Sequence, residues 1–459
     1  MKRLFVVLSI SLLLLMAGNA YAVFDSGSTG ADGAFNPPSQ VPLGTIVDGN
    51  NVTVPIPEPG LGMPDCGIFN FTTVNIPSDV TVTFTKNSKN TPVCFLAQGD
   101  VTIAGTIDVS GQNASTSMPG LGGPGGYNGG YAGGSGLAAG NGLGPGGGGG
   151  GTSSCNYGAA GGFGTTGANY GNCAIAGAPY GNASLIPLIG GSGGGGEGYF
   201  GNNQHGAGGG GAILIASSVN INVTGYVAAN GGGGFDASGS GSGGGIKFMA
   251  NAISGSGTIS AKGGQTGASP GGKGRIRIEA YTNSLVAGTD PPYSLNIYST
   301  SNPPQGVFLA NEPILRIDQI AGVTPQIRTG SYAQPDIFLP STTTNPVPVN
   351  LSAAYIPSGT TVTVSVIPQY GSTSSVNTTL SGVLEATTAA ASVTLSTQYS
   401  NVIVAQATYT IQQAMYYDNE KIEKVRVAST MGKGSETVYI TESGKEIPVK
   451  MLKMAGLVK

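Results

Sequence analysis

The chain has 459 residues, of which 81 are glycine and only 9% are charged, with one histidine and no tryptophan. This length leaves room for two or three domains, and its 39% of hydrophobic residues fall in alternating clusters, which argues against disorder throughout. Without Lys2 and Arg3 the 19 basic residues become 17, against 22 acidic ones, so the net charge of about −5 excludes nucleic-acid binding driven by bulk charge.

Residues 1–22 have the form of a secretory signal peptide. Lys2 and Arg3 precede the apolar run Leu4–Met16, and Ala20 and Ala22 form an A-x-A cleavage site. No later stretch reaches the roughly 20 apolar residues that a membrane-spanning helix needs. We therefore expect an exported protein at the cell surface or in the medium, with the periplasm as an alternative.

A short repeat then organises the chain. The phrase G-x-[Ile/Val]-x-[Ala/Val]-x-G occurs at 105–111, 225–231 and 257–263, each time 9 or 10 residues after a strand-like apolar triplet. Strands joined by glycine corners and repeated in this way are typical of stacked coils, in which each coil buries its apolar residues against the next. We predict a Gly-rich parallel β-helix over residues 23–282, with Ile259 facing inward and Ser260 on the outer face.

The alternation stops over residues 112–210, which are mostly Gly, Ser, Asn, Ala and Tyr. We predict that this insert is a long excursion from one corner, and loops of that size are usually functional or disordered. Tyrosine among Ser, Gly and Asn is the composition of adaptable binding loops, although we favour the alternative that the tyrosines only pin the loop to the coil. The candidate ligand-binding tyrosines are Tyr127, Tyr131, Tyr157, Tyr170, Tyr180 and Tyr199.

The rest of the chain has a different texture. Residues 283–312 contain Pro-Pro twice and are predicted to form a linker or cap. Over 313–412 about seven short Thr-, Val- and Ser-rich strands separated by turns predict an immunoglobulin-like β-sandwich. Residues 413–459 are predicted to form a small charged β module. The predicted fold class is therefore all-β along the whole mature chain.

Four cysteines remain after the signal peptide. An even count in an exported chain favours two disulfides, for which three connectivities are open. We pair neighbours, Cys66 with Cys94 and Cys155 with Cys173. The second bridge would close a short Gly-rich loop that has little else to hold it.

Two groups of charged residues are candidate ligand sites. Lys247 and Arg277 occupy equivalent positions on neighbouring coils and would form a basic ladder for an anionic polysaccharide, although solvated charge at an open β-edge is the favoured alternative. Asp25, Asp32 and Asp236 would offer oxygen ligands to a structural Ca²⁺, although turn-forming aspartate is the favoured alternative. No other metal or cofactor is expected.

No residue pattern points to catalysis. His205 has no Ser or Asp context of a triad, no G-x-S-x-G surrounds a serine, and no pair of carboxylates can be placed as in a glycosidase. We therefore expect a structural or adhesive surface protein that is not an enzyme, with a surface polysaccharide or another cell-surface protein as partner and self-association left open. The alternatives are polysaccharide binding by the insert tyrosines and the basic ladder, and a divergent polysaccharide lyase or hydrolase.

Four phrases carry a resemblance to a class of proteins: Gly208–Ile215, Gly243–Phe248, Gly257–Gly264 and Gly272–Ile278. They resemble the repeats of secreted glycine-rich surface proteins of Gram-negative environmental bacteria, an uncharacterised class in which poly-Gly corners alternate with I-x-I strands. The resemblance covers residues 24–280. It implies a parallel β-helix and exposure at the cell surface or in the medium, and it brings no catalytic residues. Pectate-lyase-like enzymes share this coil geometry, but the chain lacks their Asp clusters.

Overall fold

The protein is all-β. The computed structural model describes residues 23–59, 66–133, 139–152, 155–171, 174–198, 204–267, 269–304, 306–308, 313–324, 337–368, 374–398, 400–417, 420–430 and 434–448. Within these ranges the chain forms four β-sheets and no helix, and so offers no helix long and apolar enough to cross a membrane. The predicted signal peptide lies outside the described residues.

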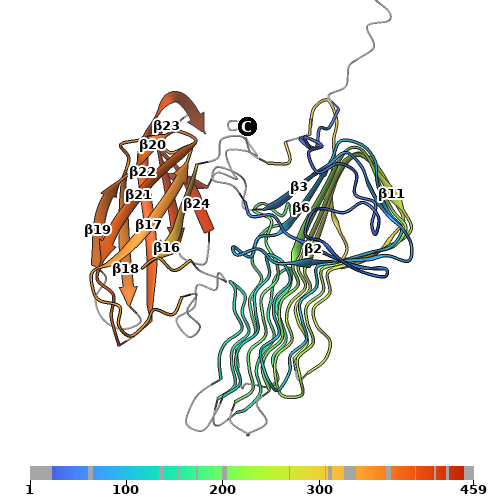
Figure 1. The fold of residues 1–459 in the computed structure, drawn as a ribbon, viewed down its shortest axis with the longest axis horizontal. Helices are drawn as coiled ribbons and strands as arrows, with labels where there is room; N and C mark the ends of the chain where they lie inside the picture. The colour runs from blue at the N-terminus through green and yellow to red at the C-terminus, as the bar shows by residue number, and fades with distance from the viewer. Residues whose placement is uncertain are drawn as a thin grey trace, which may run out of the picture.

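Between residues 46 and 297 the chain alternates between two sheets whose strands are mostly parallel (Figure 1). One sheet has the order β1-β2-β5-β8-β10-β12-β14, in which only the β1–β2 pair is antiparallel. Its strands are β1 (Ile46–Asp48), β2 (Asn51–Pro55), β5 (Thr81–Thr85), β8 (Thr106–Asp108), β10 (Tyr226–Ala228), β12 (Thr258–Ser260) and β14 (Gly288–Asp290).

The second sheet has the order β15-β13-β11-β9-β6-β3, with β7 beside β9 and β4 beside β7, and every pair in it is parallel. Its strands are β3 (Gly67–Phe71), β4 (Val74–Ile76), β6 (Val93–Ala97), β7 (Val101–Ile103), β9 (Ala212–Val223), β11 (Gly245–Gly255), β13 (Arg275–Leu285) and β15 (Ser294–Ile297).

Apolar side chains in matching register fill the space that these sheets enclose. Ile107, Val227 and Ile259 are neighbours across β8, β10 and β12, and all three are fully buried. Burial of each such side chain away from water stabilises the folded state by about 1.5–3 kcal/mol. Ser260, expected on the outer face, is also buried, and the hydrogen bond that its hydroxyl donates to Asn230 Oδ1 at 2.6 Å offsets the cost of that burial.

A bundle of extended glycine-rich strands leaves these sheets side by side, and Figure 1 draws it as parallel green to yellow traces. Strand 190–198 lies at its centre, because its backbone exchanges hydrogen bonds with six neighbouring strands. These neighbours are 126–133, 139–146, 147–152, 155–164, 204–212 and 237–245. The last two lead directly into β9 and β11, so the bundle and the sheets are continuous.

Contacts between two strands of the bundle recur at every third residue. Strand 126–133 donates to the carbonyls of Gly191, Gly194 and Glu197, with N···O distances of 3.0, 2.9 and 2.7 Å. A β-strand presents the same face every second residue, whereas a polyproline II-type strand has three residues per turn and no internal hydrogen bonds. Its backbone groups therefore point outward in several directions, which allows six hydrogen-bonded neighbours.

This packing needs glycine. A Cβ added to Gly194 would collide with the Gly239 carbonyl oxygen, and one added to Gly196 would collide with the Tyr131 carbonyl oxygen. Glycine alone lets backbones approach this closely. The described part of the 112–210 insert is thus a lattice and not a loose loop. Segments 229–245, 261–267 and 269–275 extend the lattice beyond the predicted insert.

The C-terminal part of the chain forms two antiparallel sheets that share one core. Their orders are β16-β17-β21-β20 and β19-β18-β22-β23-β24-β25, and buried residues such as Val349 and Val364 meet between them. β23, β24 and β25, which fall in the predicted charged module, continue the sheet of β18 and β22. The strands are β16 (Ile314–Ile320), β17 (Val347–Ala354), β18 (Thr361–Pro368), β19 (Ser374–Thr379), β20 (Ser381–Val383), β21 (Ala386–Val393), β22 (Asn401–Tyr417), β23 (Glu420–Thr430), β24 (Gly434–Thr441) and β25 (Glu446–Pro448).

Candidate functional site

Polar and aromatic side chains gather at the end of the bundle that points away from the sheets. Strand 204–212 enters β9 and strand 229–236 leaves β10, so Gln204 and Asp236 lie at their far ends. Backbone hydrogen bonds tie each end to a neighbouring strand: Gly158 N donates to Ala237 O at 2.9 Å, and Glu197 N donates to Gln204 O at 2.8 Å. We call the following residues the distal cluster: Tyr131, Tyr157, Tyr170, Gln204, His205 and Asp236.

Two aromatic pairs form the distal cluster's apolar surface. Tyr157 and Tyr170 stack with ring centroids 4.0 Å apart and planes 28° apart. Tyr131 meets the His205 ring edge to face at 5.6 Å. Tyr131 and Tyr170 are 55% and 47% exposed, and Phe235 beside Asp236 is 48% exposed. Aromatic faces with a polar tip held open to solvent are suited to binding, because they combine contact area with a hydrogen-bonding group.

Gln204 orders the polar part of the cluster. Its side chain is buried; Nε2 donates to Asp236 Oδ2 at 3.2 Å and Oε1 accepts from Ala237 N at 2.7 Å. Its backbone N–H donates to the buried carboxyl of Glu197 at 3.2 Å. Burial raises the pKa of Glu197, the Gln204 N–H offsets part of the rise, and the charge of Asp236 adds to it. Asp236 itself is exposed.

His205 acts as a hydrogen-bond acceptor toward the backbone. Its Nδ1 accepts from Ala132 N at 2.9 Å, and burial lowers its pKa. The neutral ring therefore carries its proton on Nε2, since the two nitrogens of a neutral imidazole divide the donor and acceptor roles. No residue of the described chain pairs this histidine with a serine or a carboxylate in the manner of a triad.

The other predicted tyrosines lie elsewhere. The Tyr180 hydroxyl donates to Gly190 O at 2.6 Å and accepts from Ser192 Oγ at 3.0 Å, which anchors the base of strand 190–198. Burial raises the pKa of that hydroxyl. Tyr127 is half-buried near the same base, where its N–H donates to Gly191 O. Tyr199 lies outside the described residues. Of the six candidates, the structure brings Tyr131, Tyr157 and Tyr170 to one end.

Lys247 and Arg277 are register partners on β11 and β13, and both engage Glu279. Lys247 Nζ lies 3.1 Å and Arg277 Nε 3.0 Å from Glu279 Oε1. Lys247 is only 4% exposed, so the pair does not offer two free cations to a ligand. Glu279 was missing from the predicted ladder, although its position two residues after Arg277 places it on the same strand face.

The predicted calcium ligands Asp25 and Asp32 accept hydrogen bonds from backbone N–H groups. Asp25 Oδ1 accepts from Gly27 N at 2.9 Å, and Asp32 Oδ2 accepts from Asn70 N at 2.6 Å. In the described ranges no group of three His, Cys, Asp or Glu side chains could hold a metal ion.

The structure joins Cys66 to Cys94 by a disulfide, as predicted, with their Cα atoms 6.0 Å apart. The described cysteines include no free thiol. The predicted partner of Cys155, Cys173, lies outside the described residues.

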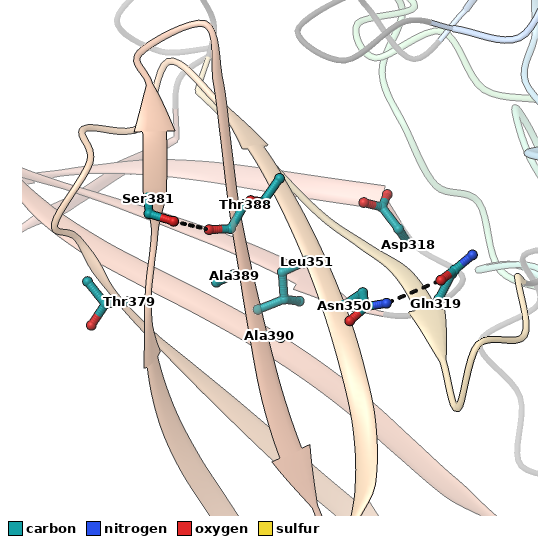
Figure 2. Close-up of a pocket in the computed structure, with 9 residues that line it drawn as sticks. All are labelled: Asp318, Gln319, Asn350, Leu351, Thr379, Ser381, Thr388, Ala389 and Ala390. Carbon is teal, nitrogen blue, oxygen red and sulfur yellow. Dashed lines mark hydrogen bonds between the residues drawn. The ribbon is translucent and has the colours of Figure 1, made fainter.

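A hollow lies on the C-terminal four-stranded sheet. Figure 2 shows Asp318, Gln319 and Asn350 on one side of it and Ser381 and Thr379 on the other. Asn350 Nδ2 donates to Gln319 Oε1 at 3.2 Å. The floor consists of small or aliphatic side chains, and none of the lining residues is aromatic. Because the hollow offers no aromatic face on which a ligand could stack, the distal cluster is the stronger candidate.

Comparison with known proteins identifies no relative of this chain: no family model, no curated protein and no solved structure matches it. The function is therefore argued from the geometry of the distal cluster and of the bundle that carries it.

Proposed function

We propose that this chain is an exported structural or adhesive protein that presents the distal cluster from a rigid support at the cell surface. The observation that carries the proposal is the six-neighbour backbone lattice around strand 190–198. A lattice of this kind extends a surface away from the sheets with few apolar side chains, because most of its contacts are backbone hydrogen bonds.

The support is best described as a parallel β-helix. Parallel pairing in matching register through both long sheets, with Ile and Val stacked in the interior, favours that description. The two antiparallel sheets that follow are compatible with an immunoglobulin-like sandwich. Export is supported by the signal-like residues 1–22 and by the Cys66–Cys94 disulfide, since disulfides persist in oxidising compartments.

Nothing in the distal cluster favours catalysis. Its carboxylate and imidazole are held by an amide and by the backbone, which suits a binding surface more than a proton-transfer site. Surface biotinylation of intact producing cells tests the proposal. We expect labelling of the full-length mature chain and attachment of the purified chain to cells or to their extracellular material. Confinement of the protein to the periplasm would overturn the proposal.

A further inference from the structure

The distal cluster combines exposed aromatic faces with hydrogen-bond acceptors and no cation. Tyr170 stacks on Tyr157 and is half-exposed, and Asp236 stands beside the exposed ring of Phe235. The charges of Asp236 and Glu197 both act on the Tyr157 hydroxyl, after the larger effect of Tyr170, and together they raise the pKa of Tyr157. The hydrogen bond from Gly158 N to Ala237 O, 2.9 Å long, places the stacked pair next to Asp236 on one surface, with the Glu197 carboxyl buried behind it.

The charge on this surface is uncompensated. The ion pairs of the described residues involve Glu279, Asp290 and Glu446, and none involves Asp236 or Glu197. An anionic polymer would meet like charge here at short range. A ligand that donates hydrogen bonds without carrying negative charge would complement it.

The acceptor is held in place for such a ligand. Gln204 Nε2 occupies only Oδ2 of Asp236, at 3.2 Å, and the other side-chain contact of Gln204 is to the Ala237 N–H. The orientation of the carboxylate is therefore set before a ligand arrives, while Oδ1 remains available. A preset polar group beside an aromatic face fixes both the position and the rotation of a ligand.

We propose that the distal cluster binds an uncharged polysaccharide, with one sugar ring stacked on Tyr170 and a sugar hydroxyl donating to Asp236. The face of an aromatic ring carries partial negative charge, and one face of a pyranose carries several C–H groups with partial positive charge. The hydroxyl groups of the sugar can donate hydrogen bonds to the Asp236 carboxylate, which only accepts them. The inference rests on the proposed presentation of this cluster and names its ligand class.

Binding by the full mature chain to four soluble polysaccharides tests the inference: dextran and laminarin as uncharged probes, polygalacturonate as an acidic probe and chitosan as a cationic probe. We expect binding to at least one uncharged probe and none to polygalacturonate. Tyr170→Ala should weaken that binding about tenfold, and Asp236→Asn should weaken it about threefold to tenfold. Asparagine keeps the positive φ of 43° at residue 236 accessible.

Thermal unfolding of Tyr170→Ala and Asp236→Asn, which should match the wild type, separates loss of contact from loss of structure. A control variant outside the cluster tests whether the loss of binding is specific to it. Phe338→Ala removes an aromatic ring that is 81% exposed outside the bundle and should leave binding unchanged. Full binding by Tyr170→Ala would overturn the inference, as would binding to polygalacturonate or chitosan alone, or to none of the four probes.

The attachment experiment distinguishes the two proposals. If the mature chain attaches to cells but binds neither dextran nor laminarin, the adhesive role stands and the uncharged-glycan inference fails. If the chain is confined to the periplasm and binds no probe, both fail. Attachment that persists after the cells are stripped of glycan would assign the surface to a protein partner and would also overturn the inference.

Discussion

Lys247 Nζ and Glu279 Oε1 form an ion pair 3.1 Å long between β11 and β13, with side chains only 4% and 8% exposed. Lys247 Nζ also donates to Ser184 O at 3.2 Å, in the segment that precedes bundle strand 190–198. Arg277 contacts the same carboxylate. The pair thus joins two adjacent strands and the base of the glycine-rich bundle, and this position makes it a structural element.

Removal of the Glu279 charge should destabilise the protein. Glu279→Gln leaves Lys247 buried without its counter-charge, and breaking a buried pair in this way costs about 3–5 kcal/mol. Asp290→Asn is the matched control: Asp290 pairs with Lys262 and Lys273, all of which are one-third or more exposed, so its loss should cost at most about 1 kcal/mol. Denaturant unfolding measures both. Equal small effects would contradict the structural role.

The same pair predicts how stability depends on pH. Burial alone would raise the pKa of Glu279, but Lys247 and Arg277 outweigh burial and hold the pKa below its ordinary value. Its stabilising contribution is therefore complete above about pH 4.3 and is lost as pH falls through the lower folded-state pKa. The free-energy gap between wild type and Glu279→Gln should narrow below about pH 4.3. A gap that stays constant down to the acid transition would contradict this assignment.

Substitution of a glycine at the centre of the bundle should destabilise the protein. Gly194→Ala places a Cβ against the Gly239 carbonyl, and such overpacking costs about 1–3 kcal/mol. A Cβ at Gly288 meets nothing within 4 Å, so Gly288→Ala should be neutral within about 0.5 kcal/mol. Thermal unfolding followed by circular dichroism compares the two. A Gly194→Ala protein as stable as Gly288→Ala would argue against close backbone packing.

The Cys66–Cys94 disulfide should stabilise the pairing of β3 with β6. The two cysteines are 28 residues apart in sequence. A cross-link that closes a loop of that length lowers the entropy of the unfolded chain and so stabilises the folded protein by about 3–4 kcal/mol. Cys66→Ala combined with Cys94→Ala removes the bridge without leaving a free thiol. We expect a lower midpoint of denaturant unfolding, and the addition of a reductant should move the wild type toward the double variant. An unchanged midpoint would show that the bridge adds nothing to the packed strands around it.

The sheets could be predicted well from the sequence because their signals are local. Alternation of apolar residues around Ile107, Val227 and Ile259 indicated strands with one buried face, and the repeat spacing placed these residues in register. Cys66 and Cys94 were paired correctly as sequence neighbours. Burial of Ser260 could not be predicted, since the partner of its hydroxyl is Asn230, which follows the neighbouring strand β10.

The bundle could not be predicted from the same signals. Sequence periods of 2 and 3.6 identify strands and helices, and a glycine run shows neither because it has no side chains to alternate. The sequence therefore presents the distal cluster only as tyrosines far apart in the chain. Hydrogen bonds between strands far apart in sequence bring together Tyr131, Tyr157 and Tyr170. Tyr180 lies in the same kind of glycine-rich sequence, yet the structure places it at the opposite end of the bundle.

The most direct test of the account is amide hydrogen exchange of strand 190–198, measured by mass spectrometry on the native protein. Gly191 N and Gly194 N donate to Gly210 O and Ala207 O at 2.7 and 2.9 Å, so these amides should exchange as slowly as those of β11. Protection should fall in Gly194→Ala and remain in Gly288→Ala. Exchange of the wild-type strand at the rate of an unfolded peptide would show that the bundle does not exist and that nothing rigid carries the distal cluster.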